Sequence, residues 1–442
     1  MSNLSLKNNP ISNFLAYRKS PLHFLHSKIN SFGKIAVLNI LGKKVFLISN
    51  PVDVEYVLAK NAKNYIKGRT TQKLSKIIGN GLITSEGELW KNQNRLIRRS
   101  FSIPNVEVLG STFLRHLDQL LHDWEKKESI DIIEEMYRLT LSIILDTLFK
   151  QNIFLKKDSL FHDVDFLLNY MIKLIRSPNP LKSFLPTREN RKFKEIMKKW
   201  NQLIDSMIES EIKNSSENGE TSLLSILLNQ ENLKEMSREL IRDEIMTLLF
   251  AGHETMTNSL AWTFILLTKN PCYFLPLRTQ AQQFFMESQF KELQKDSFAK
   301  CVLSEGMRLY PPVWSTMRES IGSDVIDNVS IPKKSIVVLG IYYTHRLEEF
   351  WDRATDFYPE RFGHEPNPNA NISGIKYYPF GHGPRACIGN HMAYLEGQLT
   401  LLKICEKYEF MFDSPYEEQQ FDPGLTLRPL NNRRLKLIKI KI

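Results

Sequence analysis

Cysteine is scarce in this sequence, and its spacing excludes the usual cysteine frameworks. The 442 residues include only four cysteines, Cys272, Cys301, Cys387 and Cys405. They lie far apart and no two form a CxxC pair, which favours neither a structural zinc site nor a disulfide framework. This use of cysteine is typical of a protein from a reducing compartment.

Long hydrophobic runs are also missing. No stretch approaches the roughly 18 consecutive apolar residues that span a membrane. The N-terminal sequence MSNLSLKNNPISNFLAYRKS lacks the apolar core of a signal peptide. Internal repeats are absent too. We therefore expect a soluble, cytoplasmic protein without a transmembrane anchor, and a single domain that covers residues 1–442.

The charge of the chain is unbalanced towards positive. There are 59 Lys and Arg residues against 49 Asp and Glu residues, a formal net charge of +10. Two interpretations stay open: a solvated basic surface, or a docking face for an acidic protein. The basic residues are scattered and match no nucleic-acid-binding motif, so nucleic acid is not expected as a partner.

Periodicity predicts a mainly α fold with small β-sheets. Residues 35–49 predict two short strands joined by a turn, and residues 335–343 predict another strand. Residues 243–267 form a long, nearly all-apolar helical pattern that should lie deep in the core. Three prolines in 177–186 break a helical region, and 213–221 predict a polar loop.

The stretch FGHGPRACIGN, residues 380–390, places one cysteine among glycines. A helical pattern follows, so the Cys387 thiol should lie just before a helix N-terminus, with Arg385 two residues away. Both features favour the thiolate. A thiolate in a rigid, bare loop can ligate a soft metal or act as a nucleophile. His382 stands in a Gly-His-Gly run, which is poor support for a catalytic base.

The pattern F-x-x-G-x-R-x-C-x-G over residues 380–389 resembles the haem-binding loop of cytochrome P450 monooxygenases. The resemblance implies that Cys387 is the metal ligand, holding the iron of haem b. It also implies that further loop residues border the haem, namely Phe380, Gly381, His382, Arg385 and Gly389.

Two charged motifs match the same family. SEGMRLYPP, 304–312, is similar to its E-x-x-R helix through Glu305 and Arg308, and FYPERF, 357–362, supplies Arg361. Alone, such a pair is usually a surface ion pair of little value. The resemblance implies a buried network of the three charges that supports the cysteine loop from behind.

The segment AGHETMT, 251–257, interrupts the apolar helix with polar residues. One interpretation is a polar kink that is satisfied internally. The other is the family's oxygen-activation motif, with Glu254 and Thr255 as catalytic acid–alcohol pair. A threonine hydroxyl can hold dioxygen and water, and a carboxylate can relay protons. Met256 departs from the family, which commonly has a second hydroxyl there.

Residues 79–101 resemble the helix that clamps a haem propionate. The family usually has Trp-x-x-x-Arg, whereas here Trp90 is followed by Asn94 at the arginine position and then by Arg95. Whether Asn94 or Arg95 takes the clamp role is open. Arg318, in STMRES, matches another propionate contact of the family.

The resemblance extends over nearly the whole chain and implies the cytochrome P450 fold, a triangular helical prism with haem between the long central helix and the cysteine-loop helix. It implies a monooxygenase that inserts one atom of O2 into a C–H bond. The chain ends soon after TLRP, 426–429, so no fused reductase domain is expected. Electrons would come ultimately from NAD(P)H through a ferredoxin or flavodoxin with its reductase, docking on basic residues around the cysteine loop. A bacterial monomer is the default expectation.

The expected substrate is small and hydrophobic. By resemblance, the pocket draws on mostly apolar regions, represented by Leu248, Ala251, Val313 and Leu425. The phrases GNGLITSEGELW and TLRP are similar to the branch with fatty-acid and terpene hydroxylases. We therefore favour a fatty acid or terpenoid.

Three alternatives remain. A peroxide-driven peroxygenase is disfavoured because such relatives usually lose the acid–alcohol pair. A non-catalytic haem-binding sensor would not need Thr255. A family member that performs desaturation, ring coupling or rearrangement stays open.

Overall fold

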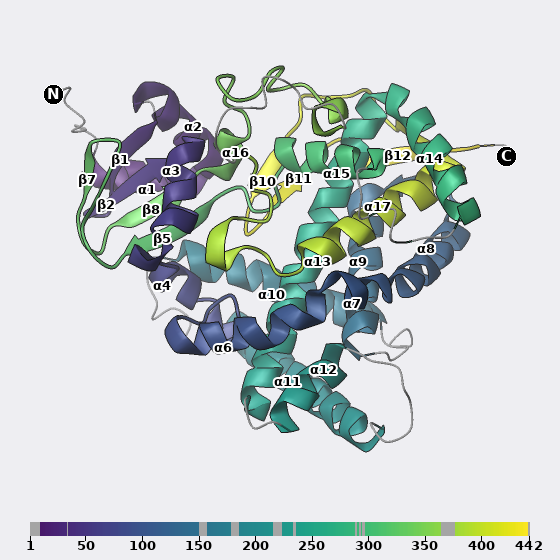
Figure 1. The fold of residues 1–442 in the computed structure, drawn as a ribbon, viewed down its shortest axis with the longest axis horizontal. Coiled ribbons are helices and arrows are strands. Elements are labelled where there is room, and N and C mark those ends of the chain that lie inside the picture. Colours follow the sequence, from purple (N-terminus) through teal and green to yellow (C-terminus); the bar gives the residue numbers. More distant parts are fainter. Residues whose placement is uncertain are drawn as a thin grey trace.

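A computed structural model describes residues 9–440, except 33, 150–156, 178–184, 215–222, 233–235, 288–289, 291–292, 294–296 and 364–375. Figure 1 shows helices filling most of the molecule, with a β-rich part on the left near the N-terminus. This arrangement agrees with the mainly α class that the sequence predicts.

The helices are α1 (Pro10–Lys19), α2 (Pro21–Phe32), α3 (Pro51–Glu55), α4 (Gly68–Gln72), α5 (Ser75–Ile78), α6 (Gly87–Arg98), α7 (Ile103–Glu107), α8 (Gly110–Trp124), α9 (Ile132–Phe149), α10 (Lys157–Arg176), α11 (Arg188–Asn214), α12 (Leu223–Asn232), α13 (Arg238–Lys269), α14 (Phe274–Glu287), α15 (Phe298–Leu309), α16 (Ile341–Thr344) and α17 (Asn390–Lys407). Short helical turns are η1 (Tyr56–Lys60), η2 (Ala62–Asn64), η3 (Arg99–Phe101), η6 (Pro271–Tyr273), η8 (Pro359–Phe362) and η10 (Gly383–Arg385). The strands are β1 (Ile35–Ile40), β2 (Lys43–Ile48), β3 (Tyr65–Ile66), β4 (Ser129–Asp131), β5 (Thr316–Ser320), β6 (Asp324–Ile326), β7 (Val329–Ile331), β8 (Ile336–Leu339), β9 (Tyr408–Phe412), β10 (Phe421–Pro423), β11 (Leu427–Pro429) and β12 (Arg434–Lys439).

The largest sheet has five strands in the order β1-β2-β8-β5-β3. β1 and β2 form an antiparallel hairpin, which confirms the strand pair predicted in 35–49, and β8 joins β2 in parallel. The hairpin turns at Leu41 and Gly42, both in the left-handed region at φ 49° and 79°. Two successive left-handed residues suit a two-residue turn whose twist matches the strands.

The strand predicted for 335–343 is wrong in its second half. β8 ends at Leu339, and α16 starts two residues later. The amides of Tyr343 and Thr344 donate to the Gly340 carbonyl, and this closes a helical turn. Ile341 and Tyr343 are buried, and the Tyr343 hydroxyl donates to the Leu22 carbonyl of α2. Apolar residues in sequence cannot distinguish such a buried helical turn from the continuation of a strand.

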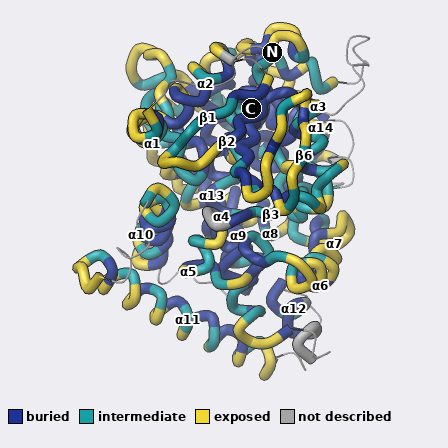
Figure 2. Tube along the Cα trace, turned by 90° about the vertical axis from the view of Figure 1, so that its left-hand side faces the viewer, coloured by how far each residue is buried: buried dark blue, intermediate teal, exposed yellow. Residues whose placement is uncertain are grey.

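The central helix α13 confirms the helix predicted for 243–267 and is longer. Ser237 caps its N-terminus by accepting a hydrogen bond from the Leu240 amide. α13 packs on α9 and α15, and every residue from 256 to 268 is buried. Figure 2 shows the buried residues concentrated in the interior around this helix.

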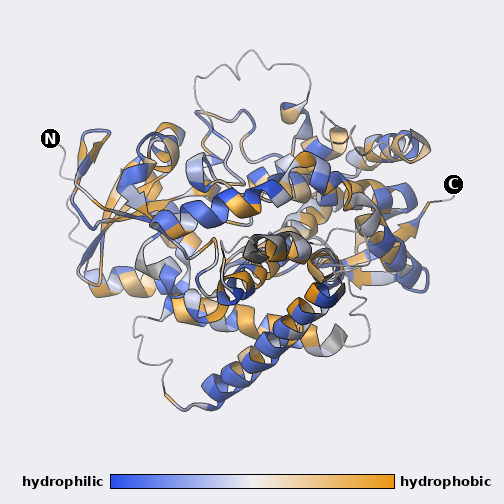
Figure 3. Cartoon of the chain, turned by 60° about the horizontal axis from the view of Figure 1, so that its bottom comes forward, coloured by the Kyte–Doolittle hydropathy of each residue, from blue (hydrophilic) through white to orange (hydrophobic). Residues whose placement is uncertain are grey.

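α11 lies at the outside of the molecule. Buried and exposed residues alternate along it in Figure 2, and hydrophilic residues line its outward side in Figure 3, as expected for an amphipathic surface helix. The proline-rich break of 177–186 separates α10 from α11, although 178–184 lie outside the described residues. Most of the predicted polar loop, 215–221, lies outside them as well.

Among the helices that the structure describes, none combines the length and the apolar character needed to cross a membrane.

Candidate functional site

The cysteine loop has a backbone conformation that favours glycine at two places. Gly381 and Gly383 both have φ of 70°. A Cβ on Gly383 would lie 2.2 Å from the Leu58 carbonyl oxygen, so a side chain is excluded there. The Cys387 amide donates to the Phe380 carbonyl at 2.8 Å and closes the loop. Three residues later α17 begins, as the sequence predicts.

The Cys387 sulfur lies in a mixed environment. Protein atoms packed around it raise the pKa of the thiol, and a hydrogen bond from the Gly389 amide lowers it in part. Part of the residue stays accessible to solvent, which leaves the sulfur open to a ligand. The prediction that Arg385 favours the thiolate is wrong, because its guanidinium pairs with Glu86 and stacks on the Trp90 ring at 3.9 Å.

Two ring contacts fix the ends of the loop. Phe380 packs on Tyr394 of α17 with ring centroids 5.2 Å apart, and His382 packs on Tyr378 at 6.0 Å. Gly389 lies against Phe101 of η3, whose ring is 3.8 Å from the position of a Cβ. The loop is therefore held by contacts with the side chains of Tyr394, Tyr378 and Phe101.

Three cations share one carboxylate beside the loop. Arg385 pairs with Glu86, and Lys67 and Arg318 lie close enough for the Arg385 guanidinium to lower their pKa and for Glu86 to raise it. Burial and the neighbouring guanidinium groups lower the pKa of Lys67 to about 7 and that of Arg318 to about 10. The sequence did not single out Lys67 for this cluster, because its neighbours are distant in the chain.

Helix α6 places the Trp90 ring against the Arg385 guanidinium. The two candidates for the propionate clamp on this helix differ in exposure. Asn94 is partly buried, whereas Arg95 is exposed on the outer side of the helix. Of the two residues, Asn94 thus has the position closer to the interior.

The structure brings the three predicted network charges together. The Glu305 carboxylate accepts hydrogen bonds from Arg308 at 2.7 and 2.9 Å and from Arg361 at 3.0 Å. Arg308 also donates to three backbone carbonyls, those of His345, Ala354 and Asp356. Glu305 and Arg308 are wholly inaccessible to solvent. Every charge in this cluster is hydrogen-bonded, which offsets the cost of burying it.

His345 connects the network to the cysteine loop, and sequence reasoning missed it. Its carbonyl accepts from Arg308, and its Nε2 accepts from the Tyr378 amide at 2.8 Å. Burial and the nearby Arg308 hold the pKa of this imidazole well below its usual range, so it is neutral. Tyr377 adds a second link by donating to the Ser304 carbonyl on α15.

Glu254 and Thr255 are neighbours on α13 but have separate partners. The Thr255 hydroxyl donates to the Ala251 carbonyl at 2.6 Å. The Glu254 carboxylate accepts from Thr426 at 2.8 Å and from the Arg428 guanidinium at 2.8 and 3.0 Å. TLRP therefore serves to anchor the carboxylate, a pairing across more than 170 residues that no local pattern indicates.

The histidine of the same motif is buried against α9. His253 Nδ1 lies 3.0 Å from the Thr140 hydroxyl, and the Tyr137 ring packs edge-on at 4.2 Å. Burial lowers the pKa of His253 to about 3. It is a neutral, internally bonded residue that fixes α13 to α9.

The four predicted pocket residues differ in exposure. Leu248 is buried, Ala251 and Leu425 are partly buried, and Val313 is exposed at 41%. Ala251 and Thr255 are one turn apart and belong to the few positions between 244 and 268 that stay partly accessible. These positions form one narrow, partly accessible face of the central helix.

Replacing Arg361 by Ala should lower the free energy of unfolding by about 3–5 kcal/mol, because the change leaves part of the Glu305 charge buried and unpaired. Arg361→Lys should recover only part of that loss, since an ammonium cannot reproduce the guanidinium geometry. Chemical denaturation measures both. The control is Arg138→Ala, which breaks the half-exposed pair with Glu134 and should cost below about 1 kcal/mol. Equal losses for Arg361→Ala and Arg138→Ala would contradict a supporting role of the network.

Comparison with known proteins places this site in a family. A family model described as "Cytochrome P450" matches residues 9–436. Cytokinin hydroxylase of Arabidopsis thaliana is 30% identical, over 83% of this chain and 74% of its own. Cyclooctatin synthase of Streptomyces melanosporofaciens is 28% identical, over 89% and 86%.

The chloroplast protein LUTEIN DEFICIENT 5 of Arabidopsis thaliana is also 28% identical, over 94% of this chain and 73% of its own. Since plant and Streptomyces proteins both match, the comparisons do not support the expected bacterial origin. The crystal structure of a cytochrome P450 haem domain superposes with a TM-score of 0.84 at 22% identity, covering 97% of this chain and 95% of that one. The chain therefore belongs to the cytochrome P450 family of haem-dependent monooxygenases and has its fold.

Proposed function

We propose that this protein is a haem-thiolate monooxygenase in which Cys387 binds the haem iron and which hydroxylates a hydrophobic fatty acid or terpenoid. The observation that carries the proposal is the loop of 380–389. Its glycine backbone, the amide of Gly389 at the sulfur and the buried support through His345 hold one accessible cysteine in a fixed place. Amide hydrogen bonds to a ligating sulfur are the usual means of tuning such a ligand.

The charges beside the loop fit the two carboxylates of haem. Lys67, Arg318 and Arg385 lie near the Glu86 carboxylate, and burial together with the two guanidinium groups lowers the pKa of Lys67. An excess of partly desolvated positive charge is unfavourable unless an anion joins it. Carboxylates that bind guanidinium groups would supply that anion. When bound, haem supplies the activation of O2.

The residues of α13 have distinct proposed roles in proton handling. The Thr255 hydroxyl lies on the accessible face of the helix and can turn from the Ala251 carbonyl to a water or a bound ligand. Glu254 is buried but bonded to Arg428, whose side chain is 25% exposed. In this proposal the Glu254 carboxylate, held by Thr426 and Arg428, relays protons towards Thr255.

The proposed substrate class rests on the apolar character of the four residues that are expected to line the pocket. Leu248, Ala251, Val313 and Leu425 offer apolar contacts and no charge, which suits an apolar molecule. Among the relatives, cytokinin hydroxylase supports hydroxylation as the reaction.

Thr255→Ala should leave substrate binding intact and divert electrons from product to hydrogen peroxide, because the variant loses the only hydroxyl on the accessible turn. Binding is measured as a saturable optical shift of the ferric haem protein on titration with fatty acids and terpenoids. Coupling is measured as product formed per NAD(P)H oxidised. The matched control is Thr263→Ala, which removes a hydroxyl with the same bond to the carbonyl four residues earlier.

Equal coupling in Thr255→Ala and wild type would contradict the monooxygenase role of this hydroxyl and favour a peroxide-driven enzyme. Binding without any product would favour a sensor. A shift with neither ligand class would contradict the lipid substrate while leaving the haem assignment standing.

For the redox partner we propose an acidic ferredoxin or flavodoxin that docks beside the cysteine loop. α6 and η3 present exposed cations there, among them Lys91, Arg98 and Arg99, and Phe101 of the same segment touches Gly389. Complementary charge would steer association.

Reduction of the protein by such a partner should slow as ionic strength rises, and Arg98→Gln with Arg99→Gln should slow it by about tenfold at low salt. Stopped-flow measurement of haem reduction tests this. The control pair Lys436→Gln and Lys439→Gln removes the same charge from β12. A rate that salt and both variants leave unchanged would contradict docking on this face.

A further inference from the structure

A cavity of about 310 Å³ lies where the C-terminal ends of α13 and α15 meet the segments 353–357 and 416–419. Its inner wall includes buried side chains such as Trp262 of α13, and its rim includes exposed ones such as Lys269. None of the described residues that line it is among those predicted to hold haem or substrate. The cavity is therefore separate from the candidate functional site.

One wall of the cavity carries a cation that has no carboxylate partner. The Arg346 guanidinium is partly buried and lies over the rings of Tyr342 and Tyr310, 3.7 and 5.2 Å from their centroids. It also hydrogen-bonds the Tyr310 hydroxyl, and burial lowers its pKa. Within the described part of the chain, no acidic side chain forms an ion pair with it. Ring faces attract a cation but leave its charge in place.

Two further cations and one carboxylate stand at the rim. Lys269, at the end of α13, is exposed, and its Nζ lies 4.6 Å from the centre of the Tyr416 ring. Arg353 donates to the Asp356 carboxylate at 3.0 Å, so the single acidic side chain of the described lining is already paired. The lining therefore carries three cations against one anion. Such an excess of positive charge in a recess attracts an anion with several oxygen atoms.

The segment 353–357 also holds the buried charge cluster in place. The Asp356 carbonyl accepts a hydrogen bond from Arg308 at 3.0 Å, and the Arg353 carbonyl accepts one from Arg361 at 3.1 Å. Arg353 and Asp356 thus contact the cluster and line the cavity at the same time. A ligand that orders this segment would stabilise the support behind the cysteine loop.

We propose that this cavity binds a small polyanion, a phosphate or a di- or tricarboxylate, and that the bound anion stabilises the segment 353–357. Arg346 would donate to two oxygen atoms of the anion through its planar guanidinium, and Lys269 would add a second charge at the rim. The volume is at the lower end for small-molecule sites, which suits a compact anion. No substrate, haem contact or redox partner enters this proposal, so it does not depend on the proposed function.

The test is isothermal titration calorimetry of the intact, haem-loaded protein with inorganic phosphate and with citrate at constant ionic strength. A saturable heat with one or both probes is expected, and the probe that responds identifies the class of the anion. The melting temperature should rise and saturate over the same concentrations, because a ligand that binds only the folded protein stabilises it. Exclusion of these salts from protein surfaces also raises Tm, but in every variant alike.

Arg346→Gln should weaken binding roughly tenfold or more, because it removes hydrogen bonds between a charged donor and the anion. Arg346→Lys should recover part of the affinity, since an ammonium keeps the charge but not the paired donors. Lys269→Gln changes an exposed side chain and should weaken binding by up to about fivefold. This second site keeps the proposal falsifiable if Arg346→Gln does not fold.

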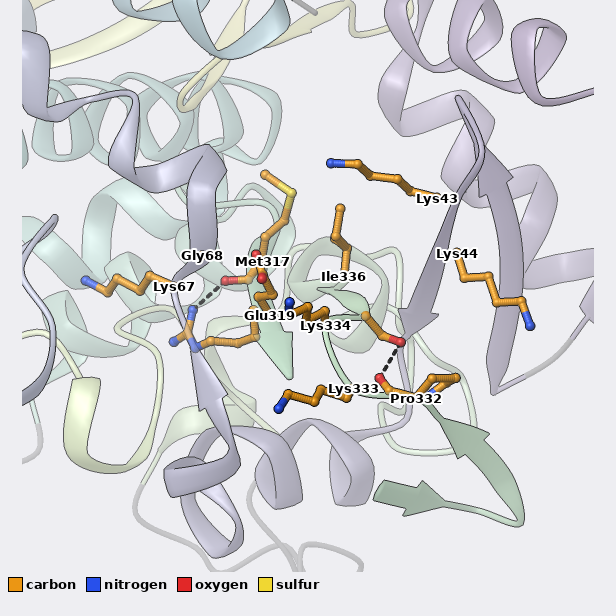
Figure 4. A pocket seen from close by; sticks show the side chains of 12 residues that line it. Lys43, Lys44, Lys67, Gly68, Met317, Glu319, Pro332, Lys333, Lys334 and Ile336 are labelled. Atoms are coloured by element: carbon orange, nitrogen blue, oxygen red, sulfur yellow. Dashed lines mark hydrogen bonds between the residues drawn. The ribbon is translucent and has the colours of Figure 1, made fainter. Parts of the chain in front are cut away.

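The control is Lys333→Gln with Lys334→Asn, which removes two cations from a different recess. Figure 4 shows these lysines at that recess, which shares Lys67 with the cation cluster beside the cysteine loop. Lys334 has a left-handed backbone with φ of 64°, a conformation that suits asparagine. The control should bind both probes as wild type does.

Three results would overturn the proposal. One is the absence of a saturable heat with either probe. Another is equal affinity in wild type, Arg346→Gln and Lys269→Gln, which would show that the anion binds elsewhere. The third is loss of binding in the Lys333 and Lys334 control alone, which would move the anion to the recess of Figure 4.

Discussion

The buried charge cluster of Glu305, Arg308 and Arg361 is the interaction on which the rest of the site depends. Arg308 is wholly buried, and its cost is offset only because Glu305 and three backbone carbonyls accept all its hydrogen bonds. Through His345 the cluster holds the Tyr378 amide, and from there the chain runs directly into the cysteine loop. The buried cluster thereby supports the segment that leads into the Cys387 loop.

Two groups of cations in the structure have different roles, one structural and one suited to ligand binding. Arg308 finds all its acceptors within the chain, so it needs nothing more. Lys67, Arg318 and Arg385 lie near one carboxylate, and burial together with repulsion from the two guanidinium groups lowers the pKa of Lys67. The first group stabilises the fold, whereas the second is suited to bind an anion that the chain does not supply.

Local sequence patterns predicted the secondary-structure elements, because these depend on residues that are close together in the chain. The β1–β2 hairpin, the long core helix and the helix after Cys387 follow from alternation and helical periodicity. The grouping of Glu305, Arg308 and Arg361 was implied by the resemblance to the cytochrome P450 family. The sequence could not reveal pairings between distant segments. Arg385 is bound to Glu86, Glu254 to Arg428 and His345 to Tyr378, and each pairing exists only after the chain has folded. The end of β8 was missed because apolar residues after Gly340 fit a strand and a buried helical turn equally well.

The most direct test of the account is the optical spectrum of the reduced, carbon monoxide-bound protein after substitution of single cysteines. Cys387→Ala should lose the spectrum typical of a thiolate-bound haem, because no other residue of the loop can replace the sulfur. Cys272→Ala, at an exposed cysteine outside the loop, should keep it. A thiolate spectrum that survives in Cys387→Ala would contradict the account, since it would place the iron on another sulfur.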